Sequence, residues 1–119
     1  MPNYTEELAY VQGLTPLERR LYFARDAYQM ERLHLDNMIA SMKEDDSIIE
    51  FYINKAREHV ANGNIELAEL LRDVAQSTKE QRYTLADVRK QRERVQWQKE
   101  RLKTAQSLVN AELKRYLET

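Results

Sequence analysis

Glu31 and His34 are the residues whose types and spacing come nearest to a metal site. They form a Glu-x-x-His pattern, which supplies two ligands from one helix in di-iron helical bundles. Such a site also needs a second Glu-x-x-His and two further inward-facing glutamates, and the chain contains no second copy of the pattern. A buried Glu31 paired with a basic residue or with His34 explains the pair equally well. The sequence therefore predicts no metal site and no cofactor.

The chain offers little for nucleophilic catalysis. It has no cysteine, which excludes thiolate nucleophiles, thiolate zinc sites and disulfides. Its serines lie in no nucleophile-elbow motif. Its two glycines, Gly13 and Gly63, stand alone, so no glycine-rich loop is available to hold a phosphate. We therefore expect a protein that is not an enzyme.

Composition indicates a long-helix protein. About half of the 119 residues are Ala, Glu, Lys, Leu or Arg, as in coiled coils and long helices. Two Gly and two Pro cannot supply the turns of a sheet-rich fold. The mean hydropathy is low, at −0.79, but the net charge of −1 and the periodic apolar residues favour folding over disorder. No apolar run approaches the ~18 residues of a membrane span, so we expect a cytoplasmic protein with no membrane contact.

Start and stop signals divide the first half of the chain into three helices. Gly13 suits the end of the first, and the capping box Thr15-Pro16-Leu17-Glu18 opens the second. The acidic run 44–46 is expected to end the second helix and to cap the third. Gly63 suits the end of the third. The predicted helices cover residues 4–12, 16–43 and 47–61.

After Gly63 the chain has neither Gly nor Pro, and we expect one helix over residues 65–118. Two columns of residues repeat along it every seven positions. The first is apolar except at one position: Leu67, Val74, Gln81, Val88, Val95, Leu102, Val109 and Tyr116. The second is polar at four positions: Leu71, Thr78, Leu85, Arg92, Lys99, Gln106 and Leu113. A heptad repeat held over this length predicts supercoiling against a partner helix.

A second interpretation of the same segment stays open. Thr84 followed by Asp87 resembles an N-cap with an acidic third residue. The segment would then split into about 65–77 and 85–118, and its second part would fold back to complete a compact four-helix bundle.

On the continuous interpretation, the short third helix covers only the first part of the long helix. Apolar residues from about Gln81 onward would then have no partner within their own chain. Burying each of them is worth about 1.5–3 kcal/mol, so we expect association with a second copy or with another helical protein. The expected interface consists of Leu85, Val88, Val95, Leu102, Val109, Leu113 and Tyr116, with Tyr83 and Trp97 as exposed aromatic contacts.

Charge is distributed unevenly along the chain. Residues 1–78 carry 8 basic and 14 acidic side chains, whereas residues 79–119 carry 11 basic and 6 acidic ones. The basic stretch could contact nucleic-acid phosphates, although Glu93 and Glu100 interrupt it. On a coiled-coil face, the same charges would set register and partner choice. The possible nucleic-acid contacts are Arg89, Lys90, Arg92, Arg94, Lys99, Arg101 and Lys103.

These patterns predict an all-α protein with a single helical domain over 1–119. Short helices over 1–64 would form a small bundle, and the coiled-coil-like helix over 65–118 would continue it. The expected function is association, as a homo-oligomeric scaffold, an adaptor or a small assembly chaperone. A nucleic-acid-associated protein using residues 89–103 is the alternative, and a carboxylate and histidine metal site in the bundle is the second alternative.

Overall fold

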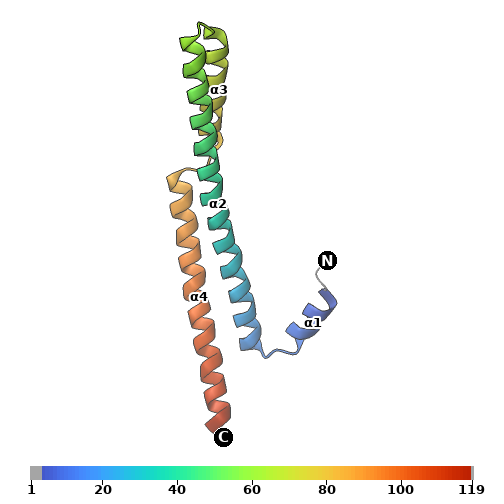
Figure 1. Cartoon of the computed structure of the whole chain (residues 1–119). Coiled ribbons are helices and arrows are strands. Elements are labelled where there is room, and N and C mark those ends of the chain that lie inside the picture. The colour runs from blue at the N-terminus through green and yellow to red at the C-terminus, as the bar shows by residue number, and fades with distance from the viewer. Residues whose placement is uncertain (1–3, 119) are drawn as a thin grey trace. The chain divides into compact units, whose positions relative to one another are not determined.

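The computed structural model describes residues 4–118, and every element in this range is an α-helix. The helices are α1 (Tyr4–Gln12), α2 (Pro16–Ala61), α3 (Ile65–Gln81) and α4 (Leu85–Glu118) (Figure 1). The predicted all-α class is therefore confirmed, and the C-terminal helix is long, with 34 residues in α4. None of the described helices is both long enough and apolar enough to cross a membrane.

Helix α2 is longer than predicted, because it runs through the acidic run 44–46 without a break. It has 46 residues, about 70 Å at the rise of an α-helix. The predicted end near Lys43 and new start at Ser47 are therefore wrong. No Gly or Pro lies between Pro16 and Gly63, and an acidic residue in a helix interior costs somewhat less than Gly and far less than Pro.

The heptad repeat of α2 also continues through the acidic run. Positions that are buried or half-buried recur at alternating spacings of three and four residues, as they do where one helix contacts another. They are Leu17, Leu21, Ala24, Tyr28, Glu31, Leu35, Met38, Met42, Asp45, Ile49, Tyr52, Ala56 and His59. We call these residues, and their counterparts on α3 and α4, contact positions. Because the repeat keeps its phase across residues 44–46, the contact positions before and after this run lie on the same side of one continuous helix, and no break is needed to bring them there.

The segment 65–118, in contrast, breaks at residues 82–84. The predicted continuous helix is wrong. The split of the alternative interpretation is confirmed, though not the compact four-helix bundle that it implied, and α3 ends at Gln81 rather than near residue 77. A capping box opens α4: the Thr84 N–H donates to Asp87 Oδ2 at 2.8 Å, and the Asp87 N–H donates to Thr84 Oγ1 at 3.2 Å.

The physical reason for the break is a change of heptad phase. The contact positions of α3 are Ala68, Leu71, Ala75 and Thr78, and the repeat continues to Arg82, the residue directly after the helix. Those of α4 are Val88, Gln91, Val95, Gln98, Leu102, Ala105, Val109 and Glu112. An unbroken repeat would have continued from α3 through Leu85 and Arg92, which are both exposed. Each predicted column thus faces α2 over part of its length: the second in α3 and the first in α4.

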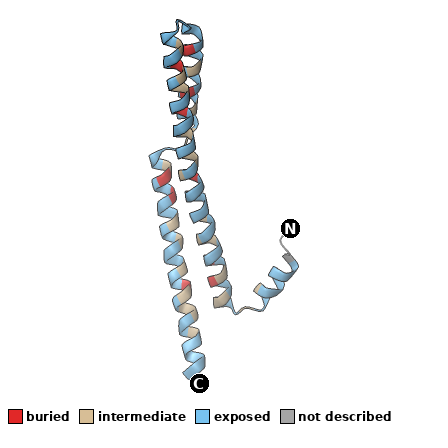
Figure 2. Cartoon of the chain, viewed as in Figure 1, coloured by how far each residue is buried: buried red, intermediate tan, exposed pale blue. Residues whose placement is uncertain are grey.

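The described chain divides into two compact units. Unit 1 comprises the chain up to His34 together with the chain from Gln91 onward, and unit 2 comprises Leu35–Lys90. Helices α2 and α4 contribute to both units, whereas α1 belongs to unit 1 and α3 to unit 2. In each unit two long helices pair, and buried residues lie on the sides that face each other (Figure 2). This pairing does not support the alternative of a compact four-helix bundle.

Unit 1 joins the first part of α2 to α4 in antiparallel fashion. Its core consists of Leu21, Ala24 and Ala105, with Leu102 and Val109 packed against it. Arg25 donates to Gln106 at 3.2 Å, and Thr15 to Glu112 at 3.4 Å. Low numbers on α2 therefore pair with high numbers on α4, as antiparallel helices require.

Helix α1 is held against α2 by polar contacts within unit 1. Arg19 donates from Nε to the Val11 carbonyl and from a terminal nitrogen to the Gln12 carbonyl, each at 3.0 Å. These two carbonyls belong to the last turn of α1, which lacks intrahelical donors. Tyr22 donates its hydroxyl to Glu7 at 2.7 Å. This bond raises the pKa of the Tyr22 phenol above its ordinary value.

Unit 2 pairs the second part of α2 with α3. The turn between them contains Gly63, whose φ of 80° lies in the left-handed region that favours glycine. The buried residues that face each other are small at most positions, with Ala56 on α2 and Ala68 and Ala75 on α3. An Arg82–Asp46 ion pair joins the far end of α3 to α2.

Candidate interaction surfaces

The predicted apolar column of the C-terminal helix is largely covered by the chain itself. Val88 is buried, and Val95, Leu102 and Val109 are half-buried. Leu102 and Val109 contact the core formed with α2. The expectation that these residues lack a partner in their own chain is therefore wrong. Its physical cause is the break at 82–84, which frees α4 to pair with the first part of α2.

Other residues of the predicted interface remain on the surface. They have exposed fractions of 39% to 81%: Tyr83, Leu85, Trp97, Leu113 and Tyr116. Leu113 and Tyr116 line a shallow pocket of about 300 Å³ in unit 1, together with Val109 and residues of the start of α2. The role of these residues in association stays a prediction.

Sequence reasoning missed a buried polar contact inside unit 1. Gln91 is 3% exposed, and its side-chain amide donates to Glu31 twice, to the backbone carbonyl at 2.8 Å and to the carboxylate at 2.5 Å. This contact explains why Glu31 occupies an apolar column, with Gln91 rather than His34 as its partner. Among the residues that the structure describes, no three His, Cys, Asp or Glu side chains gather into a metal-binding group.

Gln98 lies one heptad after Gln91 at an equivalent contact position. Its Oε1 atom is buried and accepts no hydrogen bond from the described residues. The two glutamines therefore share a register but not a hydrogen-bonding state. The heptad count places both at the helix contact, but it does not reveal which of them meets a partner.

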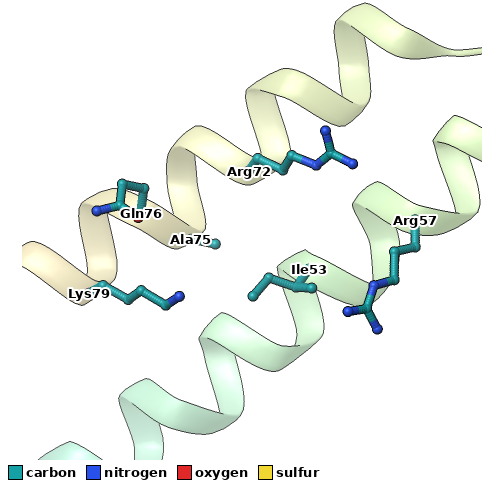
Figure 3. Close-up of a pocket in the computed structure, with 6 residues that line it drawn as sticks. All are labelled: Ile53, Arg57, Arg72, Ala75, Gln76 and Lys79. Carbon is teal, nitrogen blue, oxygen red and sulfur yellow. The ribbon is translucent and has the colours of Figure 1, made fainter.

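The two flanks of the α2–α3 pair in unit 2 differ in chemistry. Successive helix residues are about 100° apart, so a residue directly after a contact position lies on one side of the pair and a residue directly before it lies on the other. In an antiparallel pair, equivalent sides of the two helices border the same flank. Arg57 and Gln76 directly follow contact positions, and they line a shallow pocket of about 330 Å³ with Arg72 and Lys79 (Figure 3). Within it, Ile53 and Ala75 point toward one another from the two helices.

The opposite flank of unit 2 is apolar. Each of its large residues directly precedes a contact position, and each is exposed by between 36% and 62%. We call this set the apolar flank: Ile48, Phe51, Leu67, Leu70 and Val74. Its aromatic ring, Phe51, contacts the Tyr52 ring at 5.4 Å between centroids.

The basic residues of α4 are sorted by the same geometry. In unit 1, Arg94 and Arg101 directly precede contact positions, as Trp97 does, whereas Lys99 and Lys103 directly follow them. The remaining predicted nucleic-acid contacts, Arg89, Lys90 and Arg92, are also exposed. Glu93 and Glu100, the acids that interrupt the basic stretch in sequence, fall two residues before a contact position and so face away from α2.

Comparison of the sequence and the structure with known proteins identifies no family and no relative. No protein-family model, no curated protein and no solved structure matches it. Its function is therefore argued from its own surfaces.

Proposed function

We propose that the protein is a non-enzymatic association module in which the apolar flank of unit 2 packs against the same flank of a second copy. The observation that carries the proposal is the exposure of five large apolar side chains on one side of a single helix pair. Contiguous apolar surface of this kind is typical of protein interaction sites.

The distribution of side-chain size in unit 2 supports this function. Three alanines occupy buried contact positions between α2 and α3, so these positions bury little side-chain surface. The larger Leu67, Leu70 and Val74 lie beside this contact rather than in it. Burying a side chain of this size is worth about 1.5–3 kcal/mol, and only a further helix packed on the flank could bury them.

The charges beside the apolar flank favour a second copy as the occupant. On α2 near the apolar flank, the charged residues that directly precede contact positions are Glu44, Lys55 and Glu58. Lys55 and Glu58 pair with each other at 3.3 Å. When the same surface meets itself across a two-fold axis, this neutral pair brings no net repulsion. The resulting interface would join two helices from each chain into a bundle, in the manner of a homo-oligomeric scaffold.

The native mass as a function of concentration tests the proposal. We expect a mass of at least twice the 14.2 kDa of one chain in sedimentation equilibrium or light scattering. The double variant Leu70→Asp with Val74→Asp places two charges on the apolar flank and should reduce the mass to that of one chain. Helicity measured by circular dichroism should stay close to that of the unmodified protein, because both positions are exposed.

A matched control uses the opposite flank of the same helix. Arg72→Asp with Gln76→Asp introduces the same residue at the same spacing, beside the pocket of Figure 3, and should leave the native mass unchanged. A single-chain mass for the unmodified protein at every concentration would contradict self-association. Equal dissociation by both double variants would contradict the choice of flank.

A further inference from the structure

We propose that unit 1 binds single-stranded nucleic acid on a surface separate from the apolar flank. The surface is the side of the α2–α4 pair formed by residues that directly precede contact positions. We call it the cationic flank, and its binding residues are Arg20, Phe23, Met30, Arg94, Trp97 and Arg101. It shares no residue with the apolar flank and does not rest on self-association.

The cationic flank lacks acidic residues. Every residue of unit 1 that directly precedes a contact position is basic, apolar or neutral. Glu93 and Glu100 lie about 100° from Arg94 and Arg101 around α4, but they are the neighbours of Trp97 one helical turn before and after it. Glu7 of α1 lines a pocket with Phe23, and Glu31 accepts its hydrogen bonds from Gln91 at the helix contact. A polyanion that lies along this flank would therefore meet the arginines at its defining positions, with Glu7, Glu93 and Glu100 at the border.

The arginines of the flank are available to a ligand. The ion pairs between described residues include Lys55–Glu58 and Arg82–Asp46, and none of them involves Arg94 or Arg101. Arg94 and Arg101 therefore form none, although each is an exposed cation. Guanidinium groups bind phosphate through paired N–H donors, so their lack of carboxylate partners leaves these donors free for phosphates.

The aromatic residues favour a single strand over a duplex. Trp97 is 57% exposed, and Phe23 is 56% exposed. The Arg101 guanidinium lies over the Trp97 ring, 4.9 Å from its centroid, so a cation and an exposed ring lie together on this flank. Bases stack on aromatic rings when they are unpaired, whereas in a duplex they are already stacked on each other. An acidic protein would need the charges but not the ring faces.

Fluorescence anisotropy tests the proposal with a labelled thymidine oligomer of about 12 nucleotides, a length within the site sizes of stacking proteins. We expect binding that weakens with salt, with a slope of about −2 in log K against log salt if about three phosphates are contacted. Trp97 is the single tryptophan of the chain, so stacking on it should quench the intrinsic fluorescence. Trp97→Ala should weaken binding about tenfold, as loss of one stacked base does.

Two double variants of equal charge change separate the two sides of α4. Arg94→Glu with Arg101→Glu should weaken binding at least tenfold more than Lys99→Glu with Lys103→Glu, which alters the other side of the helix. Equal losses, or no binding at low salt, would overturn the proposal. Two competitors complete the test. If polyglutamate displaces the labelled oligomer as well as unlabelled oligomer does, the ligand is an acidic protein. If a duplex binds more tightly than the single strand, the stacking model is wrong. The native mass of the Arg94 and Arg101 variant should equal that of the unmodified protein, so failure here is distinct from failure of self-association.

Discussion

Gln91 and Gln98 occupy the same heptad column on α4, yet the structure gives them opposite energetic roles. Gln91 donates to the Glu31 backbone carbonyl and to one of its carboxylate oxygens, so this pair is a satisfied polar contact inside an apolar interface. Gln98 has a buried oxygen that accepts no hydrogen bond among the described residues. A buried acceptor without a partner costs about 1–3 kcal/mol, whereas removing a polar atom that has no partner removes that cost.

We therefore predict stability changes of opposite sign for the same substitution. Gln98→Leu should raise the free energy of unfolding by about 1 kcal/mol, since it removes the unsatisfied oxygen and adds apolar contact. Gln91→Leu should lower it by about 1–3 kcal/mol, because Glu31 then remains partly buried without its donor. Urea denaturation followed by circular dichroism measures both values, and changes of the same sign would contradict this assignment.

Thr84 and Asp87 illustrate how a local residue pair fixes the start of an element. The Thr84 backbone N–H, and next its hydroxyl, stabilise the Asp87 carboxylate and lower its pKa below the ordinary value. A lowered folded-state pKa means that the carboxylate stabilises the fold above its unfolded pKa of about 3.9. This contribution is lost as the pH falls through the folded-state pKa.

We predict that Asp87→Asn lowers the denaturation midpoint at pH 7 and has little effect at the lowest pH at which the protein still folds. The comparison of variant with unmodified protein at each pH isolates Asp87 from the other carboxylates, which titrate in both. A difference between the two proteins that stays constant with pH would show that the charge of Asp87 does not stabilise the α4 cap.

Helices α2 and α3–α4 show why one long apolar repeat continues and another breaks. Both segments lack internal Gly and Pro, so residue propensity alone treats them alike. In α2 the contact positions keep one heptad phase from Leu17 to His59. In the other segment the phase shifts by three residues near residue 82, and a straight helix through this point would turn one of its apolar stripes away from α2.

Proline substitutions distinguish the interior of a helix from its first residue. Asp45 lies in the interior of α2, so Asp45→Pro should lower the free energy of unfolding by about 3 kcal/mol or more. Leu85 is the first residue of α4, where proline is well tolerated, so Leu85→Pro should change stability by less than about 1 kcal/mol. Asp45→Ala serves as the side-chain control. A mild effect of Asp45→Pro would indicate that α2 has a natural break at the acidic run.

At the scale of the whole molecule, the described helices bury few large side chains. The buried apolar residues number nine, and five of them are alanine. Larger residues lie instead on the apolar flank of unit 2 and beside the arginines of unit 1. Each unit is built around one helix pair, and in unit 1 the short helix α1 is also held against α2. The proposed partners therefore occupy surfaces that pairing within one chain leaves open.

The amino-acid sequence by itself determined the helical class, the capping boxes and the apolar column from Val88 to Val109, because these depend on residues within a few turns of one another. It also contained both possible breaks, at residues 44–46 and at 82–84, but not the choice between them. That choice depends on whether the heptad phase on either side of a break matches one partner helix.

Only the tertiary structure supplied that partner, since pairing with α2 sets the phase for α3 and for α4 separately. The same pairing decided which residues are left exposed. It covered the column that sequence reasoning assigned to a partner, and it placed Leu70, Val74 and Trp97 on the open flanks. A heptad pattern predicts that a stripe of residues will be buried. Which helix buries it depends on contacts between residues far apart in the sequence, and local periodicity does not encode these contacts.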